Sequence, residues 1–137
     1  MALDNPILSS ILHQINLEDI KKEFGDPPWS RRVVLTQHIA ANVIRQPGGF
    51  DQNDSHCHNY DEWWMVLEGE IDWVIEDPKD SPVHGVPGDF IYVPAMTFHQ
   101  IFPKDEGTTI RLGMSRPDTG GHLHERPQRK AKITDEN

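Results

Sequence analysis

Residues 56–67 of the chain are His-Cys-His-Asn-Tyr-Asp-Glu-Trp-Trp-Met-Val-Leu. The apolar run that ends this stretch is typical of a strand buried on at least one face. Successive side chains on a strand alternate between two faces, so His56 and His58 project to one side and Cys57 to the other. The stretch therefore predicts a pair of imidazoles beside a β-strand. Cys57 is expected to fill space on the exterior or at an interface rather than to do redox chemistry.

The predicted strand that starts at Glu62 carries large apolar residues on both faces. Alternation places Glu62 with Trp64 and Val66, on the face that we assign to the interior. Trp63 and Met65 then point outward, where another layer of the protein or a second subunit must cover them. This pattern favours a homodimer, although an N-terminal helix folded over the sheet would serve equally.

Short runs rich in β-branched and aromatic residues continue on both sides of this stretch, and turn-forming residues separate them. The predicted strands cover residues 32–37, 40–46, 62–67, 70–76, 89–93, 97–102 and 108–115. Many short strands without intervening helices predict an all-β sandwich or barrel. We expect one such barrel over residues 29–117.

The two ends of the chain differ from this barrel. Residues 1–28 are predicted to be an N-terminal helical extension. Apolar residues recur there at helical spacing at Ile7, Leu8, Ile11, Leu12, Leu17, Ile20 and Phe24. Asn16 is a candidate cap for a helix over 17–24, and Gly25 is a candidate end. Residues 118–137 are polar, and we expect a tail with little structure of its own.

Composition limits the classes of partner. The 137 residues fit one domain with one core, and 13 basic against 22 acidic residues give a net charge of −9. This charge disfavours nucleic acid and anionic membranes, and no apolar run approaches the roughly 18 residues of a membrane helix. A single cysteine excludes an intrachain disulfide, and the first residues lack the features of a signal peptide. We therefore expect a cytoplasmic protein.

Two spaced motifs lie within the predicted barrel. The first is Gly49-x6-His56-x-His58-x3-Glu62-x6-Gly69, and the second is Gly88-x5-Pro94-x-Met96-x2-His99. This double pattern resembles the cupin superfamily, whose motifs are G-x5-H-x-H-x3-4-E-x6-G and G-x5-P-x-G-x2-H-x3-N. The chain departs from it with one extra residue after Gly49, with Met96 in place of a glycine, and with Pro103 in place of an asparagine.

The resemblance implies a jelly-roll barrel, the double-stranded β-helix, and one divalent metal ion bound by His56, His58, Glu62 and His99. Three neutral imidazoles and one carboxylate suit Fe(II), Mn(II), Co(II), Ni(II) or Zn(II), and they leave open positions on an octahedral ion. Fe(II) is the ion that we favour.

Residues that contact a substrate are harder to assign. Trp64 points inward by alternation and could stack on a substrate or simply fill the barrel. Met96 could place a thioether at the mouth of the site. Arg45 would offer a fork for a carboxylate if it lined the cavity, although an arginine is more often found at the surface. Further candidates for lining the cavity are Tyr92, Arg111 and Met114.

Three functions remain open at this stage. The first is an Fe(II) dioxygenase acting on a small organic molecule. The second is a non-redox lyase, isomerase or decarboxylase, in which a base such as Tyr92 moves a proton. The third is a small-molecule-binding protein without catalysis. His122 and His124 repeat the spacing of His56 and His58, but no third ligand lies near them in the sequence.

Overall fold

The structure is a computed structural model that describes residues 13–50, 53–76, 82–104 and 107–117. Within these ranges there is one helix, α2 (Leu17–Phe24), and eight strands follow it. The strands are β1 (Trp29–Leu35), β2 (Ala40–Pro47), β3 (Glu62–Glu68), β4 (Ile71–Ile75), β5 (Val83–Gly85), β6 (Phe90–Val93), β7 (His99–Pro103) and β8 (Thr108–Ser115). The predicted all-β fold with a short helical segment is confirmed. The helix signals at 7–12, the polar tail at 118–137 and His122 with His124 lie outside the described residues.

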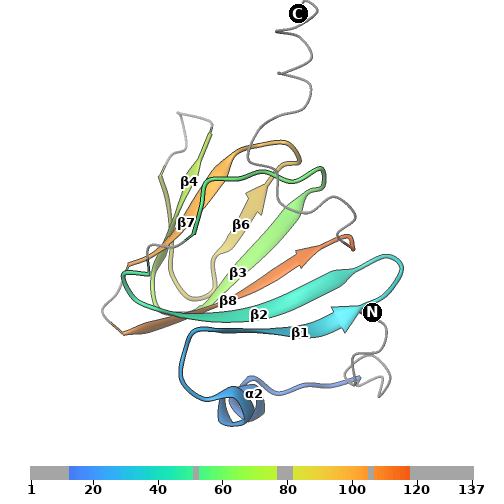
Figure 1. Cartoon of the computed structure of the whole chain (residues 1–137), viewed down its shortest axis with the longest axis vertical. Coiled ribbons are helices and arrows are strands. Elements are labelled where there is room, and N and C mark those ends of the chain that lie inside the picture. The colour runs from blue at the N-terminus through green and yellow to red at the C-terminus, as the bar shows by residue number, and fades with distance from the viewer. Residues whose placement is uncertain (1–12, 51–52, 77–81, 105–106, 118–137) are drawn as a thin grey trace, which may run out of the picture.

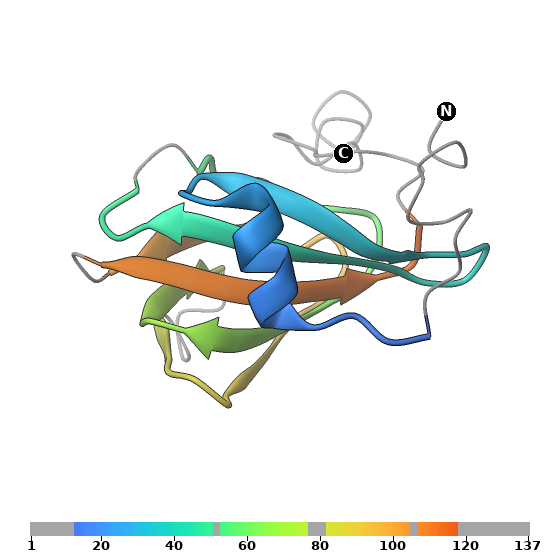
Figure 2. The ribbon, with the colours of Figure 1, turned by 90° about the horizontal axis from the view of Figure 1, so that it is seen from below.

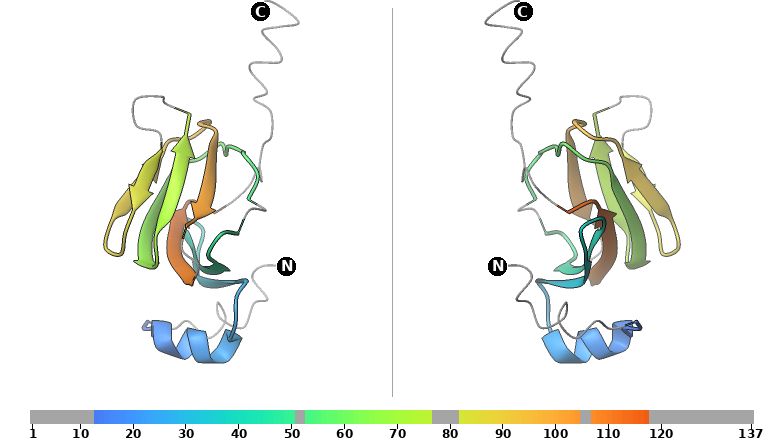
Figure 3. Two further views of the ribbon diagram at one scale, coloured as in Figure 1. Left: turned by 90° about the vertical axis from the view of Figure 1, so that its left-hand side faces the viewer. Right: turned by 90° about the vertical axis from the view of Figure 1, so that its right-hand side faces the viewer.

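The strands form two antiparallel sheets that face each other (Figures 1 and 3). One sheet has the order β1-β2-β8-β3-β6, and the other has the order β5-β4-β7. Each sheet also pairs strands that are distant in sequence, because β8 lies between β2 and β3 in one sheet and β7 pairs with β4 in the other. This crossing of the chain between two sheets is the jelly-roll arrangement.

The main core lies between the two sheets. Its buried members are Trp64, Val66, Ile71, Trp73, Ile75, Ile91, Val93 and Ile101. Glu62, Trp64 and Val66 all face this interior, whereas Trp63 is 51% exposed. The predicted alternation along β3 is therefore confirmed, and it brings a carboxylate into the same interior as the apolar core.

Helix α2 lies across the outer face of β1, β2 and β8 (Figure 2). The side-chain oxygen of Asn16 accepts hydrogen bonds from the backbone nitrogens of Glu18 and Asp19, at 2.8 and 3.3 Å, so the predicted cap is confirmed. Gly25 ends the helix with a φ of 74°. Ile20 lies on the side of the helix that faces the sheet, where it packs against side chains of β2 and β8. The helix thus covers one part of the sheet and leaves Trp63 exposed.

Two strand predictions needed correction. Strand β1 starts at Trp29, three residues earlier than predicted, because Trp29 pairs with Arg45 of β2. Strand β5 was not predicted at all, since three residues containing a histidine and a glycine show no strand periodicity. Gly85 of β5 lies so close to the core that a Cβ there would be 2.9 Å from a methyl of Val66. Within the described ranges, no helix has the length and hydropathy needed to cross a membrane.

Candidate metal centre

The four predicted ligands come from three parts of the fold. His56 and His58 lie in the segment before β3, Glu62 is the first residue of β3, and His99 is the first residue of β7. His56 and His99 form an isolated antiparallel bridge, with backbone nitrogen–oxygen distances of 3.1 and 2.9 Å. This bridge connects the histidine segment to the three-stranded sheet, while Glu62 belongs to the five-stranded sheet. The cluster therefore requires both sheets to be in place.

The side chains meet in the barrel interior. The ligand atoms of His56, His58 and His99 lie within 4.8 Å of one another. The carboxylate of Glu62 joins them, with Oε2 at 3.1 Å from Nε2 of His58 and Oε1 at 3.2 Å from Nε2 of His99. His58 and His99 are 3% and 1% exposed. The structure thus brings together all four residues that the motifs single out.

Backbone carbonyls set the tautomers of two of these histidines. Nδ1 of His56 lies 2.7 Å from the oxygen of Asp54, and Nδ1 of His99 lies 3.0 Å from the oxygen of Thr97. A carbonyl can only accept, so each Nδ1 carries the proton and each Nε2 keeps its lone pair. Metal-bound histidines are commonly oriented by such a bond from the second nitrogen.

Two hydrogen-bond acceptors, one from Glu62 and one from His99, face each other in the cluster. Nε2 of His99 is buried and makes no hydrogen bond, although it lies 3.2 Å from Oε1 of Glu62. In the tautomer that Thr97 selects, both atoms are acceptors, and two acceptors at this distance have no proton to share. A divalent ion between them would satisfy both lone pairs. The donor set and its burial fit such an ion.

The charge state of Glu62 also suits a metal ligand. Burial by itself raises the pKa of this carboxyl group, but the adjacent imidazoles of His58 and His99 together lower it by more. The net result holds the pKa of Glu62 well below its usual range, so the group is an ionised carboxylate at neutral pH.

Comparison with known proteins identifies the family of the chain. The family model described as a cupin domain matches residues 42–112, which is more than half of the chain. The chain belongs to the cupin family. No curated protein matches its sequence at a significant level.

Solved cupin structures resemble the chain over most of its length. A double-stranded β-helix protein from Klebsiella pneumoniae is 18% identical, with a TM-score of 0.66 over 84% of this chain and 99% of that one. An RmlC-like cupin from Methanocaldococcus jannaschii is 20% identical, with a TM-score of 0.62 over 78% and 90%. A structure described as a sugar phosphate isomerase from Silicibacter pomeroyi is 25% identical, with a TM-score of 0.52 over 58% and 51%. The first two comparisons show the shared fold alone.

Aromatic side chains pack directly on the ligands of this cupin. The ring of Tyr60 stacks on His58 with centroids 4.7 Å apart, and the indole nitrogen of Trp64 lies 3.4 Å from Oε1 of Glu62. Cys57 is fully buried, so the prediction that it lies on the exterior is wrong. These neighbours restrict the movement of the ligands and keep water from their flanks.

Met96 keeps the backbone conformation of the glycine that it replaces. Its φ is 59°, in the left-handed region that side chains disfavour, and its backbone nitrogen donates to the oxygen of His58 at 2.6 Å. The turn before β7 is therefore tied to the histidine segment. That the thioether lines the mouth of the site stays a prediction.

Three of the candidates for lining the cavity lie on the outside of this cupin. Arg45 points toward α2 and donates to the oxygen of Gly25 at 2.9 Å. Tyr92 is 47% exposed and donates to Asp61 at 3.2 Å, and Met114 is 43% exposed. The prediction that these residues line the cavity is wrong, because each occupies the outward position of its strand.

Arg111 is the one arginine of that group that faces inward. It is 4% exposed, its Nη1 donates to Oε1 of Gln46 at 2.7 Å, and its guanidinium carbon lies 5.0 Å from the centre of the Trp64 ring. Burial lowers the pKa of Arg111 to about 10, a change that the negative charge of Glu62 opposes. The group therefore remains a cation at neutral pH, inside the barrel and near the ligands.

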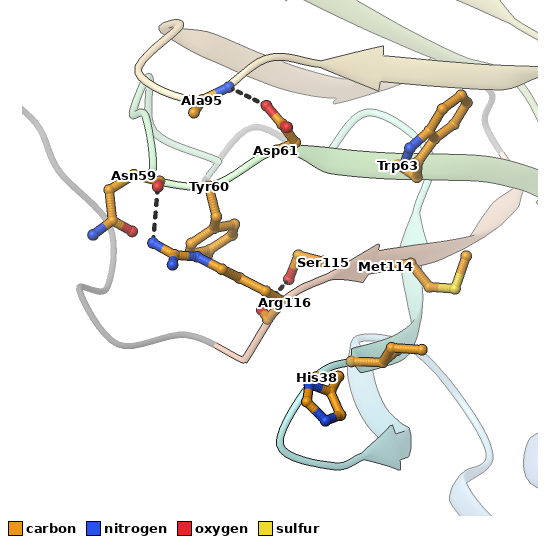
Figure 4. Close-up of a pocket in the computed structure, with 10 residues that line it drawn as sticks. His38, Asn59, Tyr60, Asp61, Trp63, Ala95, Met114, Ser115 and Arg116 are labelled. Carbon is orange, nitrogen blue, oxygen red and sulfur yellow. Dashed lines mark hydrogen bonds between the residues drawn. The ribbon is translucent and has the colours of Figure 1, made fainter.

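A pocket of about 530 Å³ opens outside the barrel (Figure 4). Its lining includes Tyr60 and Asp61, next to the histidine segment, and Trp63 with Met114 on the outer face of the sheet. Asp61 accepts a hydrogen bond from the backbone nitrogen of Ala95 at 2.8 Å, which holds the turn that contains Met96.

Proposed function

We propose that this cupin is a metal-dependent enzyme acting on a small organic molecule, and that its first candidate activity is that of an Fe(II) dioxygenase. The observation that carries the proposal is the pair of facing acceptors, Nε2 of His99 and Oε1 of Glu62. With His56 and His58 they make a donor set of three imidazoles and one carboxylate, in which His58, Glu62 and His99 are buried and His56 is half-buried. Such a set suits first-row divalent ions.

An ion held by His56, His58, Glu62 and His99 would supply open positions for a substrate and dioxygen side by side. The chain's own residues prepare this arrangement. The carbonyls of Asp54 and Thr97 orient two imidazoles. The carboxylate of Glu62 contributes one negative charge, and Trp64 packs beside it within the apolar core.

Oxygen uptake tests the dioxygenase directly. Iron-loaded protein is mixed with a panel of small enols, diols and thiols in an oxygen electrode. We expect uptake with at least one class, and we expect it to disappear in His99→Ala. The matched control is His84→Ala, which removes an exposed histidine outside the cluster. No uptake with any member of the panel would overturn the dioxygenase.

A second candidate is a non-redox enzyme such as an isomerase or lyase. The observation that favours it is the 25% identity to the structure described as a sugar phosphate isomerase. Tyr92 cannot be the base inside the barrel of such an enzyme, because the hydroxyl of Tyr92 lies on the outer face of the sheet. Turnover by zinc- or nickel-loaded protein without oxygen would select this candidate. Ligand binding by the loaded protein without any turnover would instead select a binding protein.

We also propose that two copies associate through the outer face of β3, β6 and β8. Large apolar side chains are exposed there, with Phe90 67%, Trp63 51% and Met114 43% exposed. They border an apolar pocket of about 420 Å³. Light scattering after size exclusion should give a dimer for the native chain and a monomer for Trp63→Lys. A monomeric native chain would overturn the dimer, and the cytoplasmic location stays a prediction.

A further inference from the structure

Arg111 is a buried cation that forms no direct ion pair with a carboxylate among the described residues. Its hydrogen-bond acceptor is the neutral amide of Gln46, which Asn53 also contacts. No ion pair joins the guanidinium to a carboxylate among the described residues, and its buried Nε has no hydrogen-bond partner there. A buried charge of this kind is costly unless an opposite charge offsets it.

Metal binding would leave this cation still less compensated. Glu62 is the carboxylate whose charge acts on Arg111. If Glu62 coordinated a divalent ion, its negative charge would be offset by that ion. The barrel interior would then hold two positive centres, the ion and the guanidinium of Arg111. An anion lying between them would be attracted by both.

Trp64 connects the two centres. Its indole nitrogen lies 3.4 Å from Oε1 of Glu62, and its ring lies under the guanidinium of Arg111 at 5.0 Å. Gly113 leaves room for this ring, because a Cβ there would be 2.6 Å from an indole carbon. The guanidinium and the metal ligands therefore contact the same indole, so a small ligand held by Arg111 would lie close to the metal ligands.

The free edge of the guanidinium indicates which anion fits. Nη1 is bonded to Gln46, whereas Nε has no partner. The edge that contains Nε presents parallel N–H groups, and these match the two oxygens of a carboxylate.

We propose that Arg111 and Trp64 form the anion-binding half of the substrate site, and that the substrate is a small carboxylate. This inference rests on the proposed metal-dependent function and names its substrate class. It assigns to Arg111, on the inner face of β8, the carboxylate-binding role for which Arg45 was a candidate.

Calorimetric titration of the zinc-loaded full chain tests the proposal with benzoate and propionate as probes. Their neutral isosteres, benzamide and propionamide, are the matched ligands, and phenyl phosphate is the alternative anion. We expect each carboxylate to bind about tenfold or more tightly than its amide, as for a charged hydrogen bond. Quenching of tryptophan fluorescence should follow the same order.

Variants locate the binding. Arg111→Gln should weaken benzoate binding by about tenfold or more, and Arg111→Lys should weaken it less. The control Arg45→Gln removes another arginine with a buried, unpaired Nε, which faces α2, and should leave binding unchanged. Equal affinity for benzoate and benzamide in the native chain would overturn the proposal without any variant. So would full benzoate affinity in Arg111→Gln, or a preference for phenyl phosphate.

Metal analysis separates this result from the proposed function. We expect Arg111→Gln to keep the zinc content of the native chain, because the arginine is not among the ligands. A native chain that binds no metal would overturn the metal-dependent function. Benzoate titration of that metal-free chain, compared with its Arg111→Gln variant, would then show whether Arg111 binds a carboxylate independently of a metal.

Discussion

Oε1 of Glu62 lies 3.2 Å from Nε2 of His99, although one residue opens β3 in the five-stranded sheet and the other opens β7 in the three-stranded sheet. The two atoms are held there by separate neighbours, Trp64 on the carboxylate and the carbonyl of Thr97 on the imidazole. A cation between them would therefore join the two sheets. Metal binding and barrel closure are expected to stabilise each other.

His99→Ala should sharply lower the metal content of the purified protein, because it removes the ligand that β7 contributes. Loss of even an orienting neighbour of a ligand typically weakens affinity by about 10- to 100-fold, so loss of a ligand should cost at least that much. Elemental analysis of protein purified without chelators measures the effect. His84→Ala is the control. Full metal content in His99→Ala would remove this residue from the ligand set.

Gly113→Ala should destabilise the fold by about 1–3 kcal/mol, because its Cβ would lie 2.6 Å from the Trp64 ring inside the barrel. Gly107→Ala is the matched control, since nothing described lies within 4 Å of a Cβ there, and it should change stability by no more than about 0.5 kcal/mol. Urea unfolding of both variants checks the difference. Equal stability of the two would show that the indole position is not fixed by Gly113.

Met96→Gly should be more stable than Met96→Ala by about 1 kcal/mol, because alanine retains the cost of a left-handed φ and glycine does not. Both variants remove the thioether, so the comparison isolates the backbone effect. Thermal or urea unfolding of the pair measures it. If alanine proved the more stable of the two, the turn before β7 would not hold the left-handed conformation in solution.

His84 should titrate above its ordinary pKa of 6.5, chiefly because Asp72 bonds its Nδ1 and holds the protonated ring. Since the folded pKa is the higher one, this contact stabilises the fold below the ordinary pKa. The contribution fades as the pH rises through the folded value. An NMR titration should show a lower pKa in Asp72→Asn and no change in Asp26→Asn, which alters an exposed carboxylate elsewhere. An unchanged pKa in Asp72→Asn would contradict the assigned contact.

The candidate metal centre could be predicted from sequence because its residues are chemically distinctive and three of the four are closely spaced. His56, His58 and Glu62 fall within seven positions, and the strand that begins at Glu62 has a clear alternation of buried and exposed residues. The helix cap at Asn16 was predictable for the same reason, since local backbone geometry decides it. The short strand β5 was not, because only its pairing with β4 makes it a strand.

The lining of the interior could not be predicted along β8. The apolar side of that strand faces outward and consists of Ile110, Leu112 and Met114. The side that faces the barrel carries Arg111 and Gly113. Alternation alone would assign the apolar side to the core. The structure reverses this because α2 covers Ile110 and Leu112, which gives the outer face of the sheet a core of its own.

The sequence by itself therefore indicated the family, the all-β fold and the four candidate ligands, because these depend on the spacing of residues within two motifs and on residue chemistry. The tertiary structure decided which arginine enters the barrel and which tautomers the histidines adopt. It also decided where the large apolar side chains remain exposed. These features depend on which face of each strand a distant segment covers, and that packing is not encoded in the spacing of any one strand.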